Sequence, residues 1–169
     1  PTLEPPLEPT PVLFNGIGEG EWGKLFDMTL IAIHSMLTPS GHILSYGTDM
    51  NGRQRGYLYY EVWNYNKGTG KKSREALEHK TNVDMFCSDM SIDIYTGNTL
   101  ITGGDTRGET GDSGGGVNDV LQYDWREHEI KKHPKGDMEY DRWYGTSVNL
   151  PDGRIFVIGG KGSNADKPS

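Results

Sequence analysis

The phrase LPDGRIFVIGGK at residues 150–161 decides the fold, because two related phrases precede it in the chain. They are LTPSGHILSYGTD at 37–49 and IYTGNTLITGGD at 94–105. A second phrase, EVWNYN at 61–66, returns as DVLQYD at 119–124. A repeat of roughly 40–50 residues that carries several strands is the mark of a β-propeller blade, and a step near 50 is typical of the kelch type. The sequence therefore predicts an all-β, kelch-like β-propeller.

The repeats follow one another at a constant step. The turn glycines are spaced by 56 residues, from Gly41 to Gly97 and from Gly97 to Gly153. The glycines that close the following strands keep the same step: Gly47, Gly103 and Gly159. Glycine accepts positive φ and a close approach of another backbone at little cost. We therefore expect the double glycines to lie at crowded strand ends near the propeller axis.

Eight short segments are rich in β-branched and aromatic residues and are bounded by turn residues, so we expect them to be strands. They are Leu30–Leu37, His42–Gly47, Tyr57–Tyr65, Asp89–Tyr95, Thr99–Gly104, Asn118–Trp125, Tyr144–Leu150 and Arg154–Gly160. The segment Lys72–His79, with the sequence KSREALEH, is the only candidate for a helix.

The number of repeats is too small for a closed ring. Propellers close with typically 4–8 blades, so we expect about three blades of a roughly seven-bladed ring, incomplete in this chain. The remaining blades are then expected on a missing segment or on another chain that acts as the partner. Residues 1–12, PTLEPPLEPTPV, are expected to form a Pro-rich extended arm or linker, which leaves 13–169 as the partial propeller.

Composition excludes several classes of function. The chain has 17 Lys and Arg against 24 Asp and Glu, a net charge of −7. Nucleic-acid binding depends on clustered basic residues, so we do not expect it. No stretch reaches the roughly 20 apolar residues of a membrane span. The single cysteine excludes a disulfide framework within the chain and a Cys-rich zinc site.

That cysteine stands in register with an aromatic pair of the next repeat. Cys87 opens the strand FCSDMSID, and RWYGTSV, which contains Trp143 and Tyr144, opens the corresponding strand. The step from 87 to 143 is again 56 residues. Inner strands of adjacent blades run side by side, so Cys87 and Tyr144 are predicted to approach each other. The alternative is a lone cysteine that only fills space in the core.

These segments resemble the copper-radical oxidases, the family of galactose oxidase and, more closely, the glyoxal oxidases. The resemblance covers about residues 20–161. GEWGKLFDMTLIAIHSMLTPSGHILSYGTD resembles the opening blade of glyoxal oxidases. FCSDMSID followed by TLITGGD resembles the cysteine strand of the family, and RWYGTSVNLPDGRIFVIGG its tyrosine strand. The double-glycine phrases are shared by all kelch propellers, whereas the FCS and RWY segments in this order are specific.

The resemblance implies a cofactor made from the protein's own side chains. It implies that the sulfur of Cys87 is joined to a ring carbon of Tyr144 as a thioether, and that Tyr144 is a copper ligand that holds a radical when oxidised. Trp143 is the aromatic neighbour expected to shield this radical. The implied reaction oxidises a primary alcohol or aldehyde, a carbohydrate among the candidates, and reduces O₂ to H₂O₂. The implied location is extracellular, either secreted or at the cell surface, where copper and O₂ are available.

The rest of the implied copper site is not found in this sequence. The family supplies two histidines and an axial tyrosine from later blades, one histidine directly after that tyrosine, and no Tyr-His pair occurs here. His128 and His133 in the charged segment EHEIKKH are interpreted as part of a solvated hairpin or, alternatively, as metal ligands. A second function also stays open, namely a non-catalytic kelch-like propeller used in adhesion or surface assembly.

Overall fold

The computed structural model of the chain describes residues 23–53, 58–106 and 114–162, so the proline-rich arm expected at 1–12 lies outside the described residues. The described strands form three antiparallel sheets, which we call blades 1, 2 and 3. Blade 1 consists of β1 (Ala32–Leu37), β2 (Ile43–Gly47), β3 (Tyr59–Trp63) and β4 (Arg74–Glu78). Blade 2 consists of β5 (Asp89–Ile92), β6 (Thr99–Thr102), β7 (Val120–Asp124) and β8 (Glu129–Lys132). Blade 3 has β9 (Thr146–Asn149) and β10 (Ile155–Ile158).

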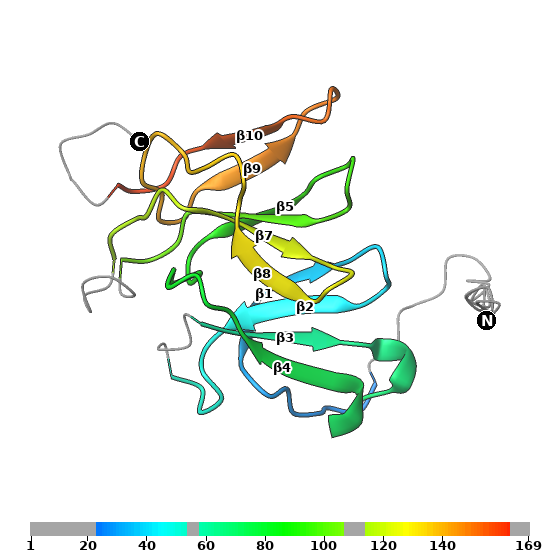
Figure 1. The fold of residues 1–169 in the computed structure, drawn as a ribbon. Helices are drawn as coiled ribbons and strands as arrows, with labels where there is room; N and C mark the ends of the chain where they lie inside the picture. The colour runs from blue at the N-terminus through cyan, green and yellow to red at the C-terminus, as the bar shows by residue number, and fades with distance from the viewer. Residues whose placement is uncertain (1–22, 54–57, 107–113, 163–169) are drawn as a thin grey trace.

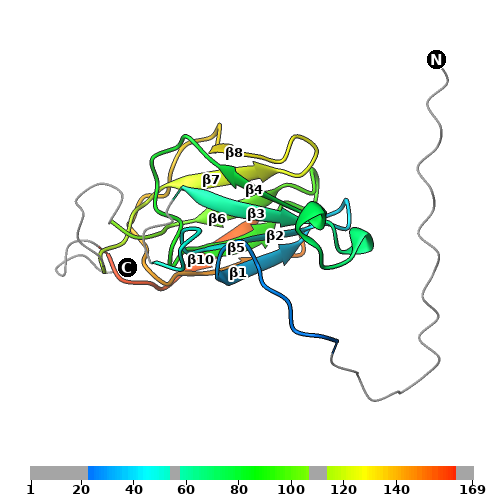
Figure 2. The ribbon, with the colours of Figure 1, turned by 90° about the horizontal axis from the view of Figure 1, so that it is seen from below.

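The three blades are stacked, with blade 2 in the middle (Figure 1). Strand β5 contacts both β1 and β9, so the first strands of the blades lie side by side. The view in Figure 2 shows β1 and β10 on one side of the stack and β8 on the other. This is the arrangement of successive propeller blades, with β1, β5 and β9 innermost.

The repeated phrase forms the same hairpin in every blade. It joins β1 to β2, β5 to β6 and β9 to β10, each as an antiparallel pair. Gly41, Gly97 and Gly153 occupy the three turns with φ values of 75°, 74° and 82°. Glycine is suited to these turns because it adopts positive φ without steric cost. The constant step in the sequence therefore corresponds to one blade following the next.

The main core lies between blades 1 and 2. The rings of Tyr60 on β3 and Tyr123 on β7 meet edge to face with centroids 6.2 Å apart. At the inner end the Tyr46 hydroxyl and Ser88 Oγ form a hydrogen bond of 2.6 Å between the two blades. The buried apolar residues of this core are Leu44, Tyr46, Tyr60, Val62, Val83, Met85, Ile101, Val117, Leu121, Tyr123 and Ile130.

Most of the helix candidate Lys72–His79 is a strand instead, since β4 covers Arg74–Glu78, while Lys72 and Ser73 belong to a 3-10 turn. Strand β4 pairs with β3 along its length, with Glu75 opposite Val62. The helix propensity of Glu, Ala and Leu is a weak preference, and pairing with a neighbouring strand overrides it. Each of the eight segments predicted as strands contains one strand of the structure, while β4 and β8 lie outside that prediction.

Short 3-10 turns, η1 (Tyr65–Lys67) and η2 (Lys71–Ser73), connect β3 to β4. In the part of the chain that the structure describes, no helix is long and apolar enough to span a bilayer.

The double glycine of blade 2 lies where backbones of neighbouring segments touch. Gly103 has a φ of 72°, and a Cβ there would overlap the carbonyl oxygen of Arg142. Gly104 has a φ of 149°, and a Cβ there would overlap the carbonyl oxygen of Asp84. Glycine is therefore required here by main-chain contact as well as by the positive φ that the sequence led us to expect.

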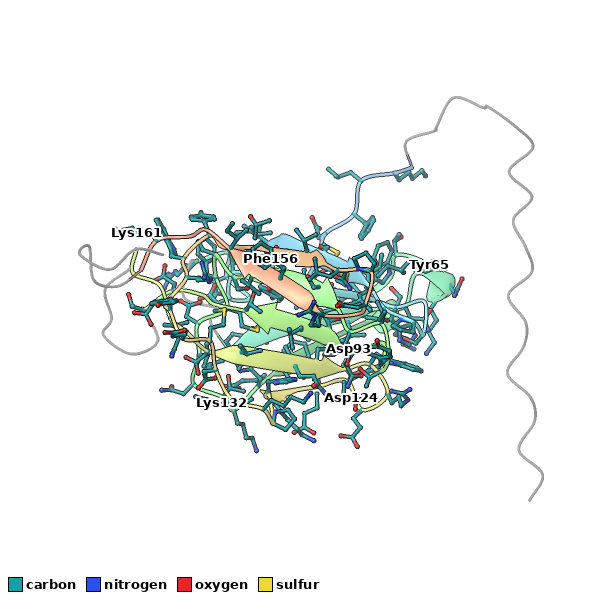
Figure 3. All side chains as sticks on the ribbon, turned by 90° about the horizontal axis from the view of Figure 1, so that it is seen from above. Tyr65, Asp93, Asp124, Lys132, Phe156 and Lys161 are labelled. Carbon is teal, nitrogen blue, oxygen red and sulfur yellow. The ribbon has the colours of Figure 1, made fainter. Side chains whose placement is uncertain are left out.

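Blade 3 presents an open apolar face. Val148 on β9 pairs with Phe156 on β10, and both side chains are 49% exposed. Ile158 on the same strand is also exposed. Figure 3, seen from above, shows Phe156 on this outer blade. An apolar face of this kind promotes association.

We predict that Gly103→Val destabilises the fold more than Gly136→Val. Both positions have positive φ, which costs a non-glycine residue about 1–3 kcal/mol. Only Gly103 also has the carbonyl of Arg142 against it, while a Cβ at Gly136 meets nothing within 4 Å. Overpacking should add about 1–3 kcal/mol to the loss at Gly103. Urea unfolding followed by tryptophan fluorescence measures the difference, and equal losses for the two variants would contradict the assigned contact.

We also predict that the chain of residues 1–169, expressed alone, self-associates through the open face of blade 3. The double substitution Val148→Lys and Phe156→Lys should shift it toward monomer in sedimentation velocity, because charge opposes burial of this face. Tyr65→Lys is the matched control, since Tyr65 is also exposed but lies away from Phe156. A compact, cooperatively unfolding wild-type monomer of 18.8 kDa would contradict the prediction.

Candidate functional site

Cys87 lies in a tight turn directly before β5. It is 1% exposed and has a φ of 62°, which is unusual for a residue other than glycine. The turn begins at Asp84, whose Oδ1 accepts a hydrogen bond from the Phe86 N–H at 2.9 Å. The Ser88 N–H then donates to the Met85 carbonyl at 3.1 Å. These local bonds hold Cys87 in its left-handed conformation.

Tyr144 occupies the corresponding place in blade 3, directly before β9. It also has positive φ, 59°, and its N–H donates to the carbonyl oxygen of Cys87 at 2.8 Å. Its side chain is 59% exposed, whereas that of Cys87 is buried. The structure thus brings Cys87 together with Tyr144, one member of the aromatic pair that the repeat step placed in register with it. Left-handed backbone at non-glycine residues costs about 1–3 kcal/mol each and is concentrated at functional sites.

The side chains of Cys87 and Tyr144 are also neighbours. The Cys87 thiol beside the Tyr144 hydroxyl raises the pKa of Tyr144. Burial raises the pKa of the Cys87 thiol, while the neighbouring Tyr144 and Trp143 side chains act in the opposite direction.

Trp143 completes the group. Its ring meets that of Tyr144 edge to face, with centroids 4.7 Å apart. Trp143 and Lys161 exchange two backbone hydrogen bonds, of 2.9 and 2.8 Å. The Lys161 ammonium lies 5.8 Å from the centroid of the indole ring. Figure 3 shows Lys161 at the end of the molecule opposite Tyr65, so the site lies at the double-glycine end of the stack.

Sequence reasoning missed the buried carboxylates behind the cysteine. Asp84 and Asp105 are 2% and 1% exposed, and the Asp105 N–H donates to the Asp84 carbonyl at 2.9 Å. Their negative charges contribute to the raised pKa of Cys87. Asp89, two residues after Cys87, accepts a hydrogen bond from the Ser147 N–H of blade 3. The sequence did offer signals for these carboxylates. Asp84 stands three residues before Cys87, and Asp49 and Asp105 end the first two repeat phrases.

Tyr144 offers one metal ligand. Its exposed phenol is accessible, and a phenolate oxygen suits copper, but copper sites of this kind also take imidazole nitrogens. Residues 23–53, 58–106 and 114–162 contain no group of three or more His, Cys, Asp or Glu side chains placed to hold a metal. Tyr144 therefore fits copper as a single ligand, and the described residues do not form a complete copper site.

His128 lies between blades rather than on a solvated hairpin face. Its Nε2 is 3.3 Å from His42 Nδ1, and its Nδ1 is 3.5 Å from Glu75 Oε2 in blade 1. Burial lowers the pKa of His42, and the neighbouring His128 and Lys67 lower it further. This contact joins the hairpin of β7 and β8 to blade 1, apart from the cysteine and tyrosine.

Comparison with known proteins gives two similarities. Two galactose oxidases of Gibberella zeae are each 28% identical to the chain in an alignment of 151 residues, with a coverage of 86% of this chain and 20% of the relative. A solved structure of a fungal alcohol oxidase of the AA5 family, in complex with copper, aligns with a TM-score of 0.64 and 24% identity. That alignment covers 83% of this chain and 28% of the oxidase. No family model matches the chain.

These similarities confirm the resemblance to the copper-radical oxidases and the incomplete propeller fold. The chain spans one fifth of the length of the curated relatives it matches.

Proposed function

We propose that this chain is part of a copper-radical oxidase that oxidises a primary alcohol or aldehyde with O₂ and releases H₂O₂. The observation that carries the proposal is the contact of Cys87 and Tyr144, two residues from adjacent blades joined by a backbone hydrogen bond of 2.8 Å. The similarity to galactose oxidases supports this class of reaction. Because the chain matches only part of these relatives, we propose the activity for the complete protein.

The reaction requires two one-electron acceptors. Oxidation of an alcohol RCH₂OH to RCHO releases two electrons and two protons, and O₂ takes up both pairs to give H₂O₂. Copper, when bound, would supply an acceptor for one electron. Tyr144 would supply the other, since its phenol ring is oxidised to a radical and returns to the phenol state by taking the second electron. Its exposed side chain lets a substrate reach the ring.

The role of Cys87 is to modify the tyrosine ring. Formation of the thioether breaks the S–H bond of Cys87 and a ring C–H bond of Tyr144, and forms one S–C bond. Two protons and two electrons pass to O₂, which becomes H₂O₂. We propose attack at the carbon next to the hydroxyl-bearing carbon, because the two side chains are near enough to shift each other's pKa. A sulfur substituent makes the phenol easier to oxidise, because it donates electron density to the ring.

Trp143 would protect the radical. Its indole meets the Tyr144 ring at 4.7 Å and covers one side of it, which reduces contact with water. Its neighbour Lys161 keeps it in place through the two backbone hydrogen bonds. We propose that the two histidines and the axial tyrosine are supplied by the remaining blades, in a missing segment or a partner chain. The enzyme would act outside the cell or at its surface, where copper and O₂ are available.

We predict that the intact protein, reduced and unfolded, has a mass lower by two hydrogen atoms than its sequence requires. This loss corresponds to the thioether, and Cys87 should then resist alkylation. Digestion should give one branched peptide that contains both Cys87 and Tyr144. A full-mass chain with an alkylatable Cys87 would contradict the proposal and favour a non-catalytic propeller used in adhesion or surface assembly.

We further predict that Cys87→Ser leaves the fold nearly intact and abolishes radical formation and oxidase turnover in the complete protein. Serine is close to cysteine in size, so packing changes little, but it cannot form the thioether. Ser91→Ala is a matched control, because Ser91 is also small and buried in blade 2. Oxygen consumption with a primary alcohol is the measurement. Turnover at the wild-type rate in Cys87→Ser would show that Cys87 only fills space.

A further inference from the structure

Arg142 joins the segment before Tyr144 to two blades at once. Its N–H donates to the Val117 carbonyl at 2.9 Å, and its carbonyl accepts from the Gly104 N–H at 3.1 Å, both on the blade 2 side. Its guanidinium Nη1 donates to the carbonyl oxygen of Gly159, directly after β10 in blade 3. One residue therefore fixes the separation of blades 2 and 3 next to the candidate site.

The side chain of Arg142 packs against two glycines, Gly145 and Gly160. A Cβ at Gly145 would come within 3.4 Å of the Cβ and Cδ of Arg142, and a Cβ at Gly160 within 3.2 Å of its Cβ. The lack of side chains at both positions lets the arginine stem pass between the strands to Gly159. The planar guanidinium is a rigid donor, so this packing sets its direction as well as its reach.

The chain that follows Arg142 depends on this anchor. Trp143 pairs with Lys161, and Tyr144 then turns with positive φ to donate its N–H to Cys87. A left-handed tyrosine is unfavourable in isolation and persists only where surrounding contacts impose it. On its N-terminal side these contacts are those of Trp143 with Lys161 and, one residue earlier, those of Arg142.

We propose that Arg142 is a positioning residue, whose guanidinium bond to the Gly159 carbonyl holds the Tyr144 ring against the Cys87 sulfur for formation of the thioether. This inference rests on the proposed function. Arg142 does not touch the reacting atoms. It acts through the backbone of Tyr144, so its loss should slow formation of the S–C bond, with O₂ as the oxidant, without removing either reacting group.

The test compares Arg142→Met and Arg142→Lys with the wild type. Methionine keeps an unbranched apolar stem and removes every donor, while lysine keeps one donor without the planar fork. Arg154→Met is the matched control. Arg154 lies in the β9–β10 hairpin of blade 3, is highly exposed, and its Nη2 is 2.7 Å from Asp152 Oδ2. Each complete protein is prepared without metal, mixed with Cu²⁺ in air, and followed by intact mass for the loss of two hydrogens. Urea unfolding of each variant is measured alongside.

We expect Arg142→Met to slow thioether formation by about 10²-fold, since a misplacement of about 1 Å can cost that much. Arg142→Lys should have an intermediate rate, and Arg154→Met the wild-type rate. A wild-type rate in folded Arg142→Met would overturn the positioning role and leave the proposed function intact. If Arg142→Met does not fold, Arg142→Lys decides: a slower rate at unchanged stability supports the role, and a wild-type rate overturns it. A wild-type protein that never loses the two hydrogens would instead overturn the proposed function, and this inference with it.

Discussion

The backbone hydrogen bond from the Tyr144 N–H to the Cys87 carbonyl is the contact on which the site depends. It joins two blades at a point where both residues have positive φ. Each conformation is costly alone, so neither would persist without the neighbouring bonds that impose it. The bond brings the buried thiol of Cys87 and the exposed phenol of Tyr144 together. This difference in exposure suits the proposed pair, in which Cys87 modifies the ring and Tyr144 meets the substrate.

The glycines of the repeat make that contact possible. Gly103 and Gly104 allow the carbonyls of Arg142 and Asp84 to approach the end of β6 without a side chain between them. The same strand ends therefore serve the fold and the site. Close packing of backbones transmits the position of one blade to the next, since a packed interior yields little to displacement.

Electrostatics keeps the thiol protonated before any reaction. Burial is the main reason that the pKa of Cys87 is raised, and the carboxylates of Asp105 and Asp84 add to it. A thiol in this state is a poor metal ligand and a slow nucleophile in its own right. The proposed reaction with the ring of Tyr144 needs an oxidant, because formation of the S–C bond releases two electrons.

The sequence by itself determined the blades and their order, because turn glycines and short apolar strands are local features that repeat along the chain. It also placed Cys87 in register with the pair Trp143 and Tyr144, since equal steps along equal repeats give equal positions. The tertiary structure decided that 74–78 is a strand, because pairing with β3 outweighs a weak helical preference. It alone decided the left-handed turns, the buried aspartates and the anchor at Arg142. These depend on contacts between residues far apart in sequence, and no local pattern encodes which backbone a carbonyl or a guanidinium will meet.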